Sequence, residues 1–290
     1  MSLGHLFFTQ SLLLFRKLVV VVNFRLTSRR DELLKFNKPV TLNSITMIKF
    51  EIVSSRIATG NNGSDKKFVV YMLQVRQDIS RLDPDPVNVE RRYTHFLDLY
   101  NGLKKDFPTI LNTISFPRKM VVGNFDPNLI TARATAFEAL LKLLSEESRL
   151  RESPAAIAFF QDVELAEARQ LMLEGSHDMA LSVLETNFRL LNKVYTDRSR
   201  VVLSALCRVV ACAATSGGAL AGPVERWAQL ALRRYEAVSD DDLLLIYIPL
   251  LHTCISICAK FSNRPLLLKR QSEAFQTVTS SIHNIFLRAT

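Results

Sequence analysis

Four basic residues in the first half of the chain have the types and spacing that suit the capture of an anion: Arg91, Arg92, Lys119 and Arg133. Arg92 and Tyr93 stand together in the stretch Glu-Arg-Arg-Tyr-Thr-His-Phe, which covers residues 90–96. Lys119 follows 27 residues after Arg92, and Arg133 follows 14 residues after Lys119. A guanidinium can donate two parallel hydrogen bonds to one phosphate group, which a lysine cannot reproduce. The chemistry that these residues could perform is the binding of a phosphate-bearing ligand.

The distribution of charge agrees with a phosphate-rich partner. The formal net charge is +9, and residues 1–46 hold 7 Lys/Arg against 2 Asp/Glu. Residues 47–160 hold 16 against 13, and residues 161–290 hold 14 against 13. The three segments therefore contribute +5, +3 and +1. A basic front half suits either a membrane surface or a nucleic acid.

The sequence lacks the short motifs by which several large classes of enzyme are recognised. The chain has no phosphate-binding G-x-x-x-x-G-K-[ST] loop, no G-x-S-x-G, no H-E-x-x-H and no G-x-G-x-x-G. Its five histidines are scattered, and His95 is interpreted as structural rather than catalytic. We therefore expect no enzymatic activity, cofactor or metal. A nucleic-acid-binding protein or a membrane-anchored scaffold is the alternative, although no nucleic-acid recognition motif is present.

The elements that must position the four residues form a predicted α+β domain of residues 47–160. Alternating apolar residues and turn chemistry, with Gly60 opening one turn, predict three antiparallel strands. Helical spacing then predicts helices, and the aperiodic residues 108–128 predict a long loop of the kind that is often functional. The expected strands cover 47–54, 68–76 and 87–92, and the expected helices cover 96–107, 129–144 and a short segment at 154–160.

The rest of the chain is predicted to be all helical. Helices joined by short turns favour a tetratricopeptide-like helical repeat. Four cysteines lie in these segments, and we interpret them as buried thiols rather than as a zinc site: Cys207, Cys212, Cys254 and Cys258. The sparse cysteines favour a cytosolic protein. The expected helices cover 163–174, 177–193, 199–214, 223–237, 242–260 and 265–287.

Residues 1–46 are expected to be an N-terminal extension. Two apolar runs within residues 1–24 are split by Arg16 and Lys17, which makes a membrane span costly. A hydrophobic anchor and a poorly ordered extension both remain open, and the second is favoured.

The ordered set of basic motifs resembles the phox-homology (PX) family over residues 47–162. That family has an Arg-Arg-Tyr motif at the end of its third strand, a Pro-containing loop with a lysine, and an arginine on the next helix. The resemblance implies that Arg92 holds the 3-phosphate of a phosphoinositide and that Tyr93 lies under the inositol ring. It implies that Lys119 meets the 1-phosphate and that Arg133 binds the ring hydroxyls.

Neighbouring residues extend this expected site. Arg118 competes with Lys119 for the 1-phosphate. Arg91 is a further candidate, although it is interpreted first as a solvated residue at the strand end. The apolar tip expected to enter the bilayer is formed by Met120, Val121 and Val122.

Simpler alternatives accompany two of these roles. Tyr93 could be an ordinary core residue, and Arg133 could pair with Glu138 or Asp126 at the surface. Thr94 and His95 stand where the family usually has Ser-Asp, which leaves the choice of headgroup open.

The order of domains resembles the sorting nexins of the 20 and 21 type, which join a PX domain to a PX-associated helical domain. The expected domains are the extension 1–46, a PX domain 47–162 and a helical protein-interaction domain 163–290. The resemblance implies a non-enzymatic, cytoplasmic protein that docks peripherally on early endosomal membranes. Phosphatidylinositol 3-phosphate is the expected lipid, and the helical domain is expected to recruit cargo or sorting proteins.

Overall fold

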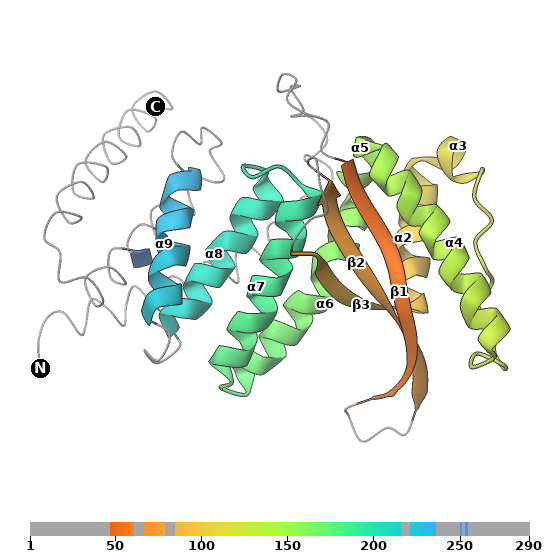
Figure 1. Ribbon diagram of the computed structural model, residues 1–290, viewed down its shortest axis with the longest axis horizontal. Coiled ribbons are helices and arrows are strands. Elements are labelled where there is room, and N and C mark those ends of the chain that lie inside the picture. Colours follow the sequence, from red (N-terminus) through yellow and green to blue (C-terminus); the bar gives the residue numbers. More distant parts are fainter. Residues whose placement is uncertain are drawn as a thin grey trace, which may run out of the picture. The chain divides into compact units, whose positions relative to one another are not determined.

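The computed structural model describes residues 47–60, 66–78, 85–215, 221–235, 250 and 253–254 (Figure 1). The predicted extension of residues 1–46, most of the first predicted turn and the predicted helix at 265–287 lie outside this part of the chain. The described residues divide into two units. One holds those of 34–167 and 186–196, and the other holds those of 168–185 and 197–290.

Three antiparallel strands form the sheet of the first unit, which confirms the predicted topology. They are β1 (Met47–Thr59), β2 (Lys67–Asp78) and β3 (Val87–Arg92), with β2 in the centre. The long β1–β2 pairing is interrupted by one irregularity between Ile52 and Ser54. Core-facing side chains alternate along β3 and from Tyr71 to Val75 of β2, because successive residues of a strand point to opposite faces.

Four helices follow the sheet in the first unit. They are α2 (Tyr93–Asp106), α3 (Pro108–Leu111), α4 (Pro127–Glu146) and α5 (Ser148–Arg151). α3 lies inside the stretch that was predicted to be a long loop, so the loop itself covers residues 112–126. α4 lies along β1 (Figure 1), and the backbone amide of Ile52 donates to the carboxylate of Glu138 at 3.2 Å.

Stacked aromatic rings form the core between the sheet, α2 and α4. The rings of Phe96 and Phe137 are stacked with centroids 3.9 Å apart, and the ring of Tyr71 meets Phe137 edge-on at 5.0 Å. Aromatic pairs of this kind stabilise a core beyond the area that they bury. This core underlies the first turn of α2, where Tyr93 begins the helix.

One continuous helix replaces two predicted ones. We expected a short helix at 154–160 and another at 163–174, but α6 runs from Pro154 to Leu173. The residues at the expected break, Gln161-Asp162-Val163, include neither glycine nor proline, so nothing local ends the helix. That break was predicted wrongly.

The C-terminal region is helical wherever the structure describes it, as predicted. After α6 come α7 (His177–Val194), α8 (Arg200–Thr215) and α9 (Ala221–Tyr235). Gly175 follows the end of α6 with a φ of 79°, which suits glycine, and the amide of Ser176 donates to the carbonyl of Leu171 at 2.8 Å. No helix within the described ranges is long and apolar enough to cross a bilayer.

Three of the four cysteines are described, and all three are free and buried: Cys207, Cys212 and Cys254. Burial raises the pKa of Cys207 to about 12 and that of Cys212 to about 11. These thiols therefore behave as small apolar side chains. Among the described residues, no cluster of His, Cys, Asp and Glu could hold a metal ion.

Candidate anion-binding site

Arg92 stands at the junction of β3 and α2 with its side chain exposed. Its guanidinium carbon lies 3.7 Å from the ring centroid of Phe68, a cation–π contact that holds the side chain against β2. The register explains this contact, since Arg92 pairs with Val70 and Phe68 is two residues away on the same face. No carboxylate among the described residues pairs with Arg92, so its donors can meet an external anion.

His95 fixes the backbone of Arg92. Its Nδ1 accepts a hydrogen bond from the Arg92 amide at 3.2 Å. Burial, together with the nearby charges of Arg91 and Arg92 and against the opposing effect of Asp98, lowers the pKa of His95 to about 4. The imidazole is therefore neutral near pH 7, with Nδ1 as acceptor and the proton assigned to Nε2. A structural role for His95 agrees with this geometry.

Tyr93 joins the helix to the loop that carries the lysine. Its hydroxyl donates to the carbonyl of Pro117 at 2.8 Å, and its ring is largely buried. The guanidinium carbon of Arg133 lies 4.2 Å from the centroid of the same ring. Burial raises the pKa of Tyr93, partly offset by the charge of Arg133, so the hydroxyl remains a donor. The predicted residues Tyr93 and Arg133 are thus in contact.

Arg133 is only 2% exposed, although it is charged. Its Nη2 donates to Oδ1 of Asn124 at 3.0 Å, so neither Glu138 nor Asp126 is its partner, as the surface-pairing alternative supposed. Its Nε has no hydrogen-bond partner among the described residues. This Nε is fully buried, and the charge of Arg133 partly offsets the rise that burial causes in the pKa of the nearby Tyr71 hydroxyl, so this donor faces the core and is closed to an external ligand.

The loop of residues 112–126 is tied to α4 at its base and exposed at its tip. Asn124 donates to the carbonyl of Met120 at 3.0 Å while it accepts from Arg133. Val121 is 95% exposed and Val122 is 79% exposed. Exposed neighbouring valines beside basic residues suit contact with a lipid surface.

Arg118 and Lys119, also in this loop, are exposed. Neither makes an ion pair or a hydrogen bond with another residue in the described part of the chain. They lie next to Pro117, whose carbonyl Tyr93 holds. The structure therefore brings Tyr93 and Arg133 into contact. Arg118 and Lys119 directly follow Pro117, the loop residue to which Tyr93 is hydrogen-bonded.

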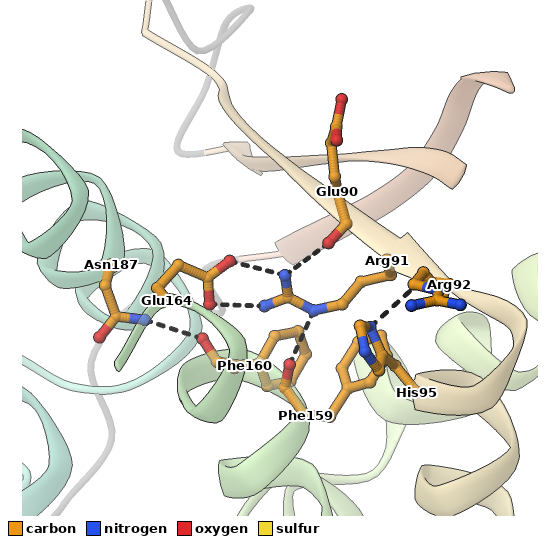
Figure 2. A network of polar contacts seen from close by, with 8 residues as sticks. All are labelled: Glu90, Arg91, Arg92, His95, Phe159, Phe160, Glu164 and Asn187. Atoms are coloured by element: carbon orange, nitrogen blue, oxygen red, sulfur yellow. Dashed lines mark hydrogen bonds and ion pairs between the residues drawn. The ribbon is translucent and has the colours of Figure 1, made fainter. Parts of the chain in front are cut away.

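Arg91 is not the solvated residue that was predicted. It is 0% exposed, and Figure 2 shows its side chain directed toward α6. It makes a two-pronged ion pair with Glu164, with Nη1 to Oε1 at 2.6 Å and Nη2 to Oε2 at 2.9 Å. Its Nε donates to the carbonyl of Phe159 at 2.9 Å. With these donors engaged inside the protein, Arg91 is corrected from a ligand candidate to a structural residue.

Sequence reasoning missed four partners of the site. Phe68 would have required the strand register, and Asn124 lies in the aperiodic stretch 108–128, where no pattern points to a partner. Phe137 lies in the expected helix 129–144, but the helical period does not reveal that its ring meets that of Tyr93. Glu164 lies 73 residues from Arg91, and no local pattern points from one to the other.

The comparisons agree with this architecture. Residues 83–163 match the sequence model of the PX domain. Bovine sorting nexin-20 is 32% identical over 163 residues, which cover 56% of this chain and 50% of that protein. Mouse sorting nexin-21 is 31% identical over 161 residues, covering 54% of this chain and 43% of that protein.

A crystal structure of the mouse SNX19 PX domain with a bound sulphate ion is also similar. It is 21% identical, covers 39% of this chain and 96% of the other, and has a TM-score of 0.33. The chain spans about half the length of the two sorting nexins that it matches.

Proposed function

Because this chain is a PX-domain protein of the sorting nexin 20 and 21 type, we propose that it is a non-enzymatic phosphoinositide-binding protein. One observation carries the proposal. Arg92 is exposed, is held on the ring of Phe68 and has no carboxylate partner among the described residues. A preorganised guanidinium fork loses little entropy when it binds a phosphate.

Each site residue has a proposed role. Arg92 binds the 3-phosphate, and Tyr93 lies under the inositol ring. Arg133 donates to ring hydroxyls through the Nη end of its guanidinium, which Asn124 holds in place. Lys119 binds the 1-phosphate, with Arg118 as the alternative.

The exposed loop tip is proposed to enter the bilayer. Burial of a valine side chain contributes about 1.5–3 kcal/mol. Each basic residue near an anionic leaflet contributes about 1 kcal/mol. Met120, Val121 and Val122 with Arg118 and Lys119 thus support moderate binding to the membrane rather than permanent insertion.

Location and partners follow from the lipid. Phosphatidylinositol 3-phosphate is the proposed ligand, which would make the protein cytoplasmic and peripheral on early endosomes. The helical region is proposed to bind cargo or sorting proteins, since helical repeats offer extended protein-binding surfaces.

Liposome co-sedimentation tests the proposal. Full-length protein is mixed with vesicles that contain each mono- or bisphosphorylated phosphoinositide at equal surface charge. We expect selective binding to 3-phosphorylated lipid, lost in Arg92→Ala. Arg149→Ala is the matched control, because Arg149 is an exposed arginine whose one ion pair is long, at 3.7 Å. Binding that follows lipid charge alone and survives Arg92→Ala would contradict the proposal.

A further inference from the structure

A buried ion pair stands directly behind the proposed phosphate ligand. Arg91 makes four hydrogen bonds, two to Glu164, one to the carbonyl of Phe159 and one to the carbonyl of Glu90. The side-chain exposures are 0% for Arg91 and 8% for Glu164. Figure 2 shows the guanidinium between the end of β3 and a turn of α6. The last residues of β3 are therefore held by α6.

Glu164 lies outside the segment that matches the PX domain. That segment ends at residue 163, and Glu164 is the next residue of α6. The same turn of α6 is held from α7, because Nδ2 of Asn187 donates to the carbonyl of Phe160 at 3.0 Å (Figure 2). The residues that hold the end of β3, Glu164 and Asn187, thus lie beyond the segment that matches the PX domain.

Fixing Arg91 also fixes Arg92. Successive side chains of a strand point to opposite faces, so the inward direction of Arg91 sets the outward direction of Arg92. A buried ion pair adds little net stability compared with apolar residues, but it demands one geometry. The two-pronged bond to Glu164 therefore fixes the position of Arg91, and removing Glu164 alone would also destabilise the fold by leaving Arg91 buried without its partner.

We propose that Glu164 is a positioning residue for phosphate binding, acting through Arg91 on the backbone of Arg92. The inference rests on the proposed function. The expected change in affinity is opposite to the one that charge alone predicts, because a carboxylate near a phosphate site opposes binding through its charge. Removal of that charge should strengthen binding if Glu164 acts only through its field, and weaken binding if it positions Arg92.

The test uses full-length protein and soluble dibutanoyl phosphatidylinositol 3-phosphate, measured by calorimetry well below the unfolding temperature of every variant. Glu164→Gln keeps the shape of the side chain and removes the charge. We expect its Kd to rise about tenfold, comparable with one lost charge-assisted hydrogen bond. Glu167→Gln is the matched control, since Glu167 is exposed, one turn further along α6, and loses the same charge. Its Kd should not rise, since the loss of a nearby negative charge can only favour the binding of a phosphate.

A double-mutant cycle separates positioning from general damage. In an Arg92→Lys background the two-pronged phosphate contact is already lost, so Glu164→Gln should have little further effect. An equal loss in both backgrounds would overturn the inference, as would a Kd for Glu164→Gln that is unchanged or lower.

If Glu164→Gln fails to fold, Glu164→Asp provides a second test, because it keeps the charge but shortens the side chain. It should weaken binding in the same way, and wild-type affinity of this variant would overturn the inference. Absence of binding by the wild-type chain would instead remove the proposed function itself.

Discussion

His95 controls the backbone at the point where β3 becomes α2. Its Nδ1 accepts from the Arg92 amide, which is the reverse half of a capping box. Only the neutral imidazole can accept this bond. Burial and the charges of Arg91 and Arg92 favour that form, lowering the pKa of His95 to about 4.

The stability of the protein should therefore depend on His95 below neutral pH. The unfolded state, with a His95 pKa near 6.5, binds the proton first, so the stability is complete above pH 6.5 and falls as the pH drops toward 4. His95→Asn keeps an acceptor that does not titrate. We expect the drop in Tm between pH 7 and pH 5, followed by circular dichroism, to be smaller in His95→Asn than in the wild type. Equal drops would contradict this role.

Arg91 and Arg92 show what could be predicted at single residues. The interpretation of Arg91 as solvated followed from residue type, since charged residues are rarely buried unless paired. The alternation of Val87, Val89 and Arg91 carried the opposite signal, because all three share the buried face of β3. The exposure of Arg92 follows from the same alternation. What the sequence could not provide was the partner, Glu164.

Close contact between two helices depends on Gly102 of α2. A Cβ atom at this position would lie 2.5 Å from the Cβ of Ala155 on α6. A glycine inside a helix costs about 1 kcal/mol relative to alanine, so its presence here needs a reason. The close approach of α2 and α6 supplies that reason.

Gly102→Ala should therefore destabilise the protein although alanine is the better helix former. Overpacking of this kind costs about 1–3 kcal/mol, and the neighbouring Cβ cannot rotate away. We expect a lower urea midpoint for Gly102→Ala and recovery in the double variant Gly102→Ala/Ala155→Gly. Asn101→Ala, at an exposed position of α2, is the control and should be neutral or slightly stabilising. An unchanged midpoint for Gly102→Ala would show that the helices can separate without cost.

Elements were predictable where their patterns are local. β3 and α4 carry regular periods of two and 3.6 residues, and their predicted positions agree with the structure. The second half of β1 is exposed and polar, so its extension to Thr59 follows from pairing with β2 rather than from its own pattern. The false break in α6 had no glycine or proline behind it, which is the signal that should have kept the helix whole.

At the scale of the whole molecule, residues far along the chain complete the first unit. Residues 186–196 of the chain belong to it, although the PX match ends at residue 163. Among the hydrogen bonds that connect them are those from Asn187 to the Phe160 carbonyl at 3.0 Å, from Gln77 to the Lys193 carbonyl at 2.7 Å, and from Tyr195 to the Arg151 carbonyl at 2.8 Å. Hydrogen bonds between residues so far apart in the chain produce no periodic pattern in the sequence, so they could not be predicted from it. The predicted boundary between residues 162 and 163 falls inside α6.

A fragment series should show that the stable lipid-binding unit continues to residue 196. Fragment 40–162 lacks Glu164 and the rest of α6, so Arg91 loses its ion-pair partner and the fragment should be less stable. Fragment 40–174 restores Glu164 but lacks Asn187, and fragment 40–197 contains both. We expect urea midpoints to rise in that order, with the largest step between the first two. Equal midpoints would mean that the segment matching the PX domain needs nothing from the helices that follow it.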